Sequence, residues 1–223
     1  MVTIAIFLSY AKAGKKFTAL QHFKKPTTVI PSPKTILKVK TKASEANAFV
    51  KKNNYNTEFC FLIDLNLPSN QKRFFVYDFK KNRVPNSGLV THGNCNEIWL
   101  EGRRYGNTTG CGCSSIGKYK IGYAYYGKFG LAFKLYGLET TNDKAMERYV
   151  VLHSHSCVPD TEVNNDICQS NGCPTVSPKF LKEIEPLIKG SKKPILLGLL
   201  SKVTITAYAL HPLILLQLRY TPQ

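Results

Sequence analysis

The sequence predicts a mainly β domain with a few short helices. From Thr57 onward, short runs rich in Phe, Val, Ile, Leu and Tyr alternate with segments rich in Asn, Gly, Pro and Ser, the pattern of strands joined by turns. Hydrophobic residues make up 43% of the 223-residue chain and aromatic residues 11%, which excludes wholesale disorder. A chain of this length can bury one good-sized core, and it has no internal repeat.

The N-terminal segments differ from this core. Residues 1–13 form a candidate signal peptide, because an apolar run precedes the small-x-small pattern Ala11-Lys12-Ala13, although basic side chains before the run are missing. A buried first strand would give a similar pattern. Residues 14–56 are basic and contain three prolines, so we expect a mobile lead-in that ends in a short helix over residues 43–50.

The strands begin after Thr57 and first form a β-meander. Residue alternation predicts strands over residues 59–64, 73–79 and 89–93, separated by a Pro-Ser-Asn turn and a turn at Asn82. The three strands follow one another directly, so we expect antiparallel neighbours.

Strand character returns after a loop rich in Gly, Thr, Ser and Cys over residues 107–117. We expect strands over residues 118–122 and 133–136, and then a brief helix over residues 142–147. That helix leads into a strand over residues 149–153.

The last predicted element of the main domain is a helix. It starts at the cap Ser177-Pro178, keeps its apolar spacing to Ile188 and ends at Gly190. We place the main domain at residues 57–197 and treat residues 198–223 as an atypical apolar C-terminal tail. The apolar stretch over residues 196–218 is interrupted by Lys202, His211 and Pro212. Three interpretations remain open for it: a membrane span, extra strands or a poorly ordered tail.

The net charge of +17, from 31 Lys and Arg against 14 Asp and Glu, indicates an attraction to polyanions. Nucleic acid, anionic lipid headgroups and anionic cell-wall polymers all carry suitable charge. The basic residues form no recognisable RNA- or DNA-binding motif, so no nucleic acid is expected as partner. Charge therefore narrows the class of partner without defining a reaction.

Seven cysteines are many for a cytosolic chain of this size, and the odd number suggests one thiol kept apart. If Cys173 is that thiol, the other six could form up to three disulfides in fifteen connectivities. We hypothesise that Cys157 and Cys168 bond to each other and stiffen the loop between His153 and Cys173.

Two segments supply a candidate nucleophile and base. Residues 150–155 read as a buried strand with His153 at its edge, and residues 170–174 as a tight turn that presents Cys173. A nearby imidazole is the usual device that lowers a thiol pKa and accepts its proton. Gly172 allows a sharp turn with N–H groups free to face a substrate oxygen. A buried structural cysteine beside an ordinary loop is the alternative reading.

Zinc binding is a second alternative for the same residues. His153, His155, Cys157, Cys168 and Cys173 are side chains of the type that tetrahedral zinc prefers. Their spacing fits no common zinc motif, and a metal would consume the proposed nucleophile, so we expect no metal and no cofactor.

Several segments together resemble the murein L,D-transpeptidase catalytic domain family, a branch of the YkuD-like L,D-transpeptidases. The matching segments, in chain order, are Lys72–Asp78, Leu89–Gly93, Ser114–Tyr119, Tyr126–Gly130, Leu135–Glu139, Asn142–Ala145, Val151–His153 and Ser170–Pro174. Each segment alone is a weak signal, and their order makes the set specific.

The resemblance implies a β-sandwich-like catalytic domain that cross-links peptidoglycan stem peptides. By matching position, Cys173 would be the nucleophile that forms a thioester with a donor tetrapeptide, and His153 the general base. Gly172 and Cys173 N–H groups are natural oxyanion donors, and Ser154 could orient the imidazole. An acceptor amine would resolve the thioester.

Other residues are candidates for the substrate cleft, namely His92, Ser170, Asn171 and His155. Asn171 stands where many relatives have a histidine, and His155 could compensate, because it lies on the same face of the strand as His153. His155 as a loop residue without a role remains an alternative, and so does His92 as a strand-end residue with local hydrogen bonds.

Three classes of function follow from these observations. The first is an exported acyltransferase of the periplasm or cell envelope, the second an inactive relative that serves as a basic cell-wall-binding module, and the third a zinc protein. The sequence does not indicate the acceptor amine or the oligomeric state.

Overall fold

The computed structural model describes residues 31–201, which hold two α-helices, one short 3₁₀ helix and eight strands. The segments at residues 1–30 and 202–223, which include the candidate signal peptide and most of the C-terminal tail, lie outside the described residues. The elements are α1 (Pro33–Lys52), β1 (Phe59–Asp64), β2 (Phe74–Asp78), β3 (Arg83–Gly88), β4 (Gly117–Gly127), β5 (Gly130–Gly137), η1 (Asp143–Ala145), β6 (Val151–Ser154), β7 (Thr175–Val176), α2 (Pro178–Lys189) and β8 (Leu196–Leu200).

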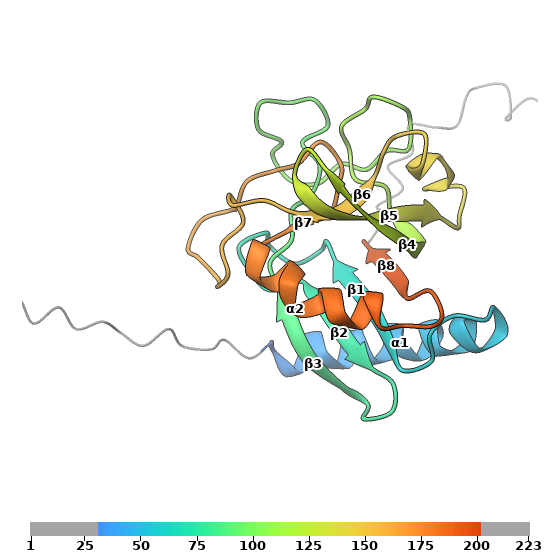
Figure 1. Ribbon diagram of the computed structural model, residues 1–223. Coiled ribbons are helices and arrows are strands. Elements are labelled where there is room, and N and C mark those ends of the chain that lie inside the picture. Colours follow the sequence, from blue (N-terminus) through green and yellow to red (C-terminus); the bar gives the residue numbers. More distant parts are fainter. Residues whose placement is uncertain (1–30, 202–223) are drawn as a thin grey trace, which may run out of the picture. The chain divides into compact units, whose positions relative to one another are not determined.

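All eight strands of the described part join in one sheet, in the order β3-β2-β1-β8-β4-β5-β6-β7. Strands β1, β2 and β3 form the predicted antiparallel meander. Strand β8 comes last in the chain but lies in the middle, parallel to β1 and antiparallel to β4. It therefore connects the meander to the half of the sheet that carries β6 and β7 (Figure 1).

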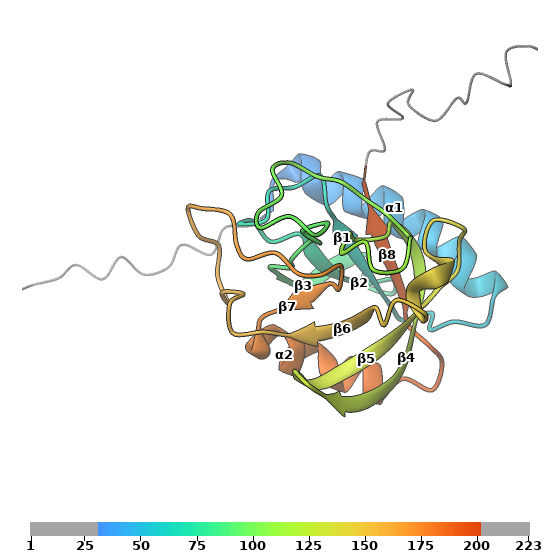
Figure 2. The ribbon, with the colours of Figure 1, turned by 90° about the horizontal axis from the view of Figure 1, so that it is seen from above.

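The sheet bends so that its two halves enclose one hydrophobic core, which gives a sandwich-like arrangement. Figure 1 shows β2 and β3 below α2 and β4 to β7 above it, and Figure 2 looks down onto β4 and β5 with α2 beneath them. Phe61 of β1, Phe133 of β5 and Ile184 of α2 belong to this core and are at most 1% exposed. A bridge between Val90 and Val176 brings the chain after β3 back to β7, at the far edge of the sheet. The mainly β fold agrees with the sequence prediction.

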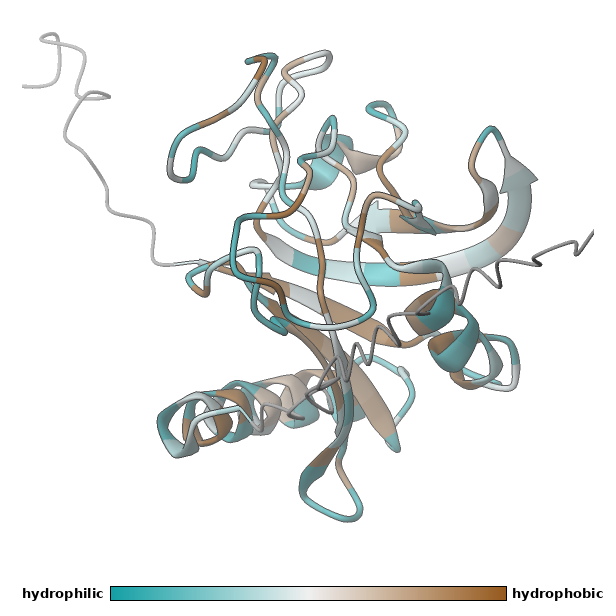
Figure 3. Cartoon of the chain, turned by 90° about the vertical axis from the view of Figure 1, so that its left-hand side faces the viewer, coloured by the Kyte–Doolittle hydropathy of each residue, from teal (hydrophilic) through white to brown (hydrophobic). Residues whose placement is uncertain are grey.

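Helix α1 covers the other face of the meander and is longer than the eight-residue helix predicted from the sequence. Its Ser32 cap accepts a hydrogen bond from Thr35 N–H, and Pro33 occupies the first turn, where its missing N–H costs nothing. The buried stripe of Val39, Ala43, Ala46 and Val50 packs on β1 and β2, and Figure 3 shows this helix of mixed hydropathy beside hydrophobic strands. The sequence predicted a mobile lead-in before residue 43, whereas the helix begins ten residues earlier, at Pro33.

The third strand lies earlier than predicted. Strand β3 covers Arg83–Gly88, whereas residues 89–93 contribute only isolated bridges at Val90 and Gly93. Strand β3 is an edge strand, so its outer side needs no apolar residues and tolerates Pro85. The apolar residues that follow it are buried instead beside β7, which explains why hydrophobicity placed the strand too late.

The remaining elements follow the prediction with shifted ends. Strand β4 extends to Gly127, and the brief helix over residues 142–147 is reduced to the 3₁₀ turn η1. Helix α2 begins at its predicted cap, where Ser177 Oγ accepts from Phe180 N–H. The first part of the apolar tail is the buried strand β8, one of the three alternatives left open. Within residues 31–201, no helix has the length and apolar character needed to cross a membrane.

Candidate active site

Parallel pairing of β6 with β7 brings the two predicted segments together. His153 of β6 pairs with Thr175 of β7, and Cys173 lies two residues before Thr175. The crossover loop between the two strands contains the Cys157–Cys168 disulfide, as we hypothesised from the sequence. A second disulfide joins Cys95 to Cys113. Cys173 itself is a free thiol.

The candidate residues meet at a cavity of about 220 Å³. Cys173 and His153 both line it, so the two side chains open onto one space although their residues are far apart in the chain. The other lining residues are Thr91, Phe129, His155, Cys157, Gln169, Ser170, Asn171 and Thr175. Three of the four predicted cleft residues therefore lie here.

His153 is held in one orientation and one tautomer. It is 6% exposed, and its Nδ1 donates to the carbonyl oxygen of Ser154 at 3.1 Å. Its Nε2 is then the lone-pair atom, and it accepts from the Thr175 hydroxyl at 3.0 Å. The ring of Phe129 stacks on the imidazole with centroids 4.8 Å apart. Burial lowers the pKa of His153, so the ring is neutral at neutral pH.

The Cys173 thiol is partly exposed and does not hydrogen-bond to His153. Its Sγ donates instead to the carbonyl oxygen of Tyr149 at 3.8 Å. Burial raises the pKa of the thiol, and the Val151 N–H and the Arg148 guanidinium act in the opposite direction. The sequence predicted that a nearby imidazole would lower the pKa of the Cys173 thiol. In the observed arrangement the pKa is raised, and both members of the pair are neutral at neutral pH.

Arg148 is a feature of the site that sequence reasoning missed. Its Nη2 donates to the Cys113 carbonyl oxygen at 2.6 Å, and its Nη1 donates to the Gly106 carbonyl oxygen and to Ser115 Oγ. The guanidinium thus binds the Cys95–Cys113 disulfide loop and places a positive charge near Cys173. No spacing rule links an arginine on a turn to a cysteine 25 positions later, so the sequence carried no signal for it.

The turn that presents Cys173 depends on glycine and on two side-chain hydroxyls around it. Gly172 has a φ of 107°, and a Cβ there would lie 2.6 Å from the Cys113 carbonyl oxygen. Ser170 Oγ accepts from Gly172 N–H at 3.2 Å and donates to the Cys173 carbonyl oxygen at 2.7 Å, where Thr91 Oγ1 also donates. The Gly172 N–H is therefore occupied. The Cys173 N–H donates to no residue in the described part of the chain, so it is the open donor.

His92, the fourth predicted cleft residue, lies elsewhere. It is 2% exposed, and its Nδ1 accepts from Arg73 Nη2 at 3.1 Å, with Arg103 Nη1 at 3.5 Å from Nε2. Burial and these two cations lower the pKa of His92 to about 3. His155 does line the cavity, where its Nδ1 accepts from Cys157 N–H at 3.1 Å.

The structure does not favour the zinc reading. Cys157 and Cys168 are consumed by their disulfide, and residues 31–201 contain no group of three or more His, Cys, Asp or Glu side chains placed to hold a metal. A larger cavity of about 1030 Å³ is lined by Arg103, Tyr105 and Asp166 among others, but none of its lining side chains is a thiol or an imidazole. Of these two cavities, the one of about 220 Å³ is therefore the one lined by a thiol and an imidazole.

Sequence comparison identifies the class of this domain. The L,D-transpeptidase catalytic domain family matches residues 33–195, so the chain belongs to this family of peptidoglycan enzymes. The match begins at α1, which agrees with the packing of that helix on the sheet. The comparison with curated protein sequences finds no significant match.

Two solved structures are similar to the chain. The helical cell shape determining protein Pgp2 from Campylobacter jejuni matches with 14% identity and a TM-score of 0.41, over 65% of this chain and 48% of the other. A fused Zn-dependent amidase/peptidase/peptidoglycan-binding domain-containing protein from Clostridium acetobutylicum matches with 12% identity and a TM-score of 0.35, over 79% of this chain and 67% of the other. The chain thus spans about half the length of the Campylobacter protein.

Proposed function

We propose that the chain is an L,D-transpeptidase that forms a thioester between Cys173 and a peptidoglycan stem peptide. The observation that supports this most directly is the single cavity lined by both a free, partly exposed thiol and the imidazole of His153. Family membership supplies peptidoglycan as the substrate class. No cofactor enters the reaction.

In the proposed acylation, the sulfur of Cys173 attacks the carbonyl carbon of the third residue of a donor tetrapeptide. Nε2 of His153 accepts the thiol proton, since Nδ1–H is tied to the Ser154 carbonyl oxygen and fixes the tautomer. The developing oxyanion accepts from the Cys173 N–H, and loss of one such donor typically lowers the rate about a hundredfold or more. Collapse breaks the amide bond, and the proton on His153 leaves with the terminal D-alanine amine.

The second half-reaction reverses these roles. The amine of an acceptor stem attacks the thioester carbon, His153 takes its proton, and Cys173 leaves as a thiol. A new amide bond joins the two stems, so atoms and protons balance over the cycle. In this scheme Ser154 is a positioning residue that acts through its carbonyl group, and Ser170 holds the turn through Gly172 and Cys173.

This function requires export to the periplasm or cell envelope, where peptidoglycan is assembled. A cell-wall enzyme domain suggests an extracytoplasmic location. Two disulfides within the described residues fit an oxidising compartment. We also propose that the candidate signal peptide at residues 1–13 is cleaved off during export.

Intact-mass measurement tests the nucleophile. Wild-type protein incubated with a carbapenem, and separately with a donor tetrapeptide, is expected to gain the mass of one acyl group, and Cys173→Ala to gain none. Cys111→Ala is the matched control, because Cys111 is the other partly exposed free thiol and lies outside the cavity. Adduct formation on Cys173→Ala would contradict the assignment.

The neutral resting pair gives weight to one competing function, an inactive relative that only binds the cell wall. Under that function the folded wild-type protein forms no adduct with either reagent, yet binds peptidoglycan as well as Cys173→Ala does. The same two measurements therefore separate the enzyme from the binding module.

A further inference from the structure

The face of the sheet that carries the active site continues past the cavity. Residues paired across a ladder point to the same side, as do residues two positions apart in one strand. His153 pairs with Ala132 of β5, and Val151 pairs with Lys134. Lys134 therefore projects from the same face as His153, two pairs along the ladder.

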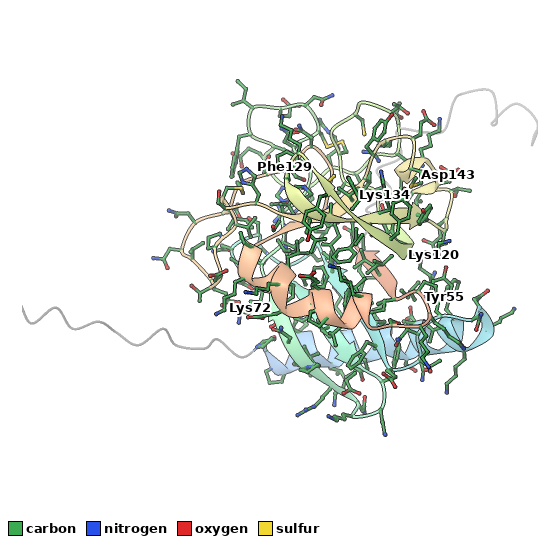
Figure 4. All side chains as sticks on the ribbon, in the orientation of Figure 1. Tyr55, Lys72, Lys120, Phe129, Lys134 and Asp143 are labelled. Carbon is green, nitrogen blue, oxygen red and sulfur yellow. A yellow bond between two sulfur atoms is a disulfide. The ribbon has the colours of Figure 1, made fainter. Side chains whose placement is uncertain are left out.

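Lysines alternate with tyrosines on this face, a set that we call the Lys–Tyr row. Lys134 Nζ lies 4.6 Å from the ring centroid of Tyr125 and 6.0 Å from that of Tyr149. Lys120 Nζ lies 4.5 Å from the ring centroid of Tyr136, its partner in the β4–β5 ladder. Figure 4 shows Lys134 and Lys120 projecting from the hairpin of β4 and β5, with Phe129 at its far end.

The row lies on the outer face of the sheet, where Lys120, Tyr125, Lys134 and Tyr136 are partly exposed. The residues of β5 that alternate with it, Phe133 and Leu135, point into the core and are at most 1% exposed. Tyr149 is 77% exposed, and neither Lys120 nor Lys134 forms an ion pair within residues 31–201. Both ammonium groups are thus available to an external anion, and both are held in place by rings.

Tyr149 links the row to the candidate nucleophile. Its carbonyl oxygen lies 3.8 Å from Cys173 Sγ, and its ring centroid lies 6.0 Å from Lys134 Nζ. Tyr149 has a φ of 56°, a left-handed conformation that is uncommon for a tyrosine, and this turn directs its carbonyl and its ring to different neighbours. A polymer lying along the row would therefore pass beside the cavity.

We propose that the Lys–Tyr row binds the peptidoglycan strand whose stem peptide enters the Cys173 cavity. Stem peptides carry free carboxylates that pair with ammonium groups, and a sugar ring can stack on the exposed Tyr149 ring. The charge of +17 favours the same partner over long range. This inference takes its polymer from the proposed function, but it concerns binding and not the chemical step.

Co-sedimentation with insoluble peptidoglycan tests the row. All variants are made in the full-length Cys173→Ala chain, so binding is measured without catalysis and failure of the proposed chemistry cannot mimic failure of the row. K120E/K134E is expected to weaken binding at least about tenfold, from two lysines worth roughly 1 kcal/mol each against an anionic surface. K120Q/K134Q removes only the charges, keeps long side chains over the rings and is expected to weaken binding in the same direction.

The matched control is K34E/K40E on the exposed side of the N-terminal half of α1, which changes the net charge by the same amount. Its binding is expected to stay within about twofold of the parent, because exposed charges far from a partner are largely screened. If both charge-reversal variants lost the same affinity for peptidoglycan, the proposal would be overturned, because binding would then depend on the total charge and not on the position of the lysines. The proposal would also be overturned if K120E/K134E bound peptidoglycan as tightly as the parent. The same holds if, in a parallel titration, the variant lost affinity for nucleic acid alone.

Discussion

Replacing Gly172 by alanine tests the geometry on which the candidate nucleophile depends. An alanine at a φ of 107° costs about 1–2 kcal/mol of backbone strain. Its Cβ would also lie 2.6 Å from the Cys113 carbonyl oxygen, a group that Arg148 holds, and overpacking of this kind costs about 1–3 kcal/mol. We therefore expect Gly172→Ala to lower the free energy of unfolding by about 2–5 kcal/mol.

Gly110→Ala is the matched control, because Gly110 has a φ of 75° and nothing lies within 4 Å of the added Cβ. It should show the backbone strain alone, about 1–2 kcal/mol. The assay is urea unfolding of both variants followed by circular dichroism, combined with the acylation rate of Cys173. If the two variants differ in stability by less than about 0.5 kcal/mol, close packing of Gly172 against the disulfide loop is not a determinant of the turn.

Two further predictions concern pH. The pKa of His92 is 6.5 in the unfolded chain and about 3 in the folded protein, so the unfolded chain binds more protons between these pH values. We therefore expect the free energy of unfolding to fall by up to a few kcal/mol as the pH drops from 6.5 toward 3. His92→Gln should flatten this loss in acid-unfolding curves. The raised pKa of Cys173 predicts that its alkylation by iodoacetamide, measured in Cys111→Ala protein, still accelerates above pH 9, whereas a rate that levels off near pH 7 would indicate a preformed thiolate.

The sequence singled out the residues of the candidate site more readily than their surroundings. Cys173, His153 and the flanking Gly172 could be found because residue type and local pattern specify them, and the ladder of β6 and β7 then brings them to one cavity. His92 could not be placed in the same way. Its position in a strand-like run says nothing about the two arginines that enclose it, because Arg73 lies just before β2 and Arg103 lies in a loop after His92.

The fold shows the same division between local and distant information. Helix α2 was found at its cap, since Ser177 and Pro178 are adjacent in the sequence. Strand β3 was displaced because an edge strand buries little, and the apolar run after it is buried by β7, more than eighty residues later. The central position of β8 could not be predicted for the same reason. An apolar run near the end of the chain does not show that it will insert between β1 and β4.

The resting state of the pair has a consequence for how the proposed acylation would be driven. Burial favours the neutral form of both Cys173 and His153, and each unit of pKa shift corresponds to about 1.4 kcal/mol. The ion pair must therefore be created as the sulfur attacks, and the groups that lower its energy are those that face the new charge. The Cys173 N–H is open to the oxyanion, and the Arg148 guanidinium lies near the sulfur. Both groups are held by the same disulfide loop and turn, so loss of Gly172 should slow acylation by displacing the N–H and the cation together.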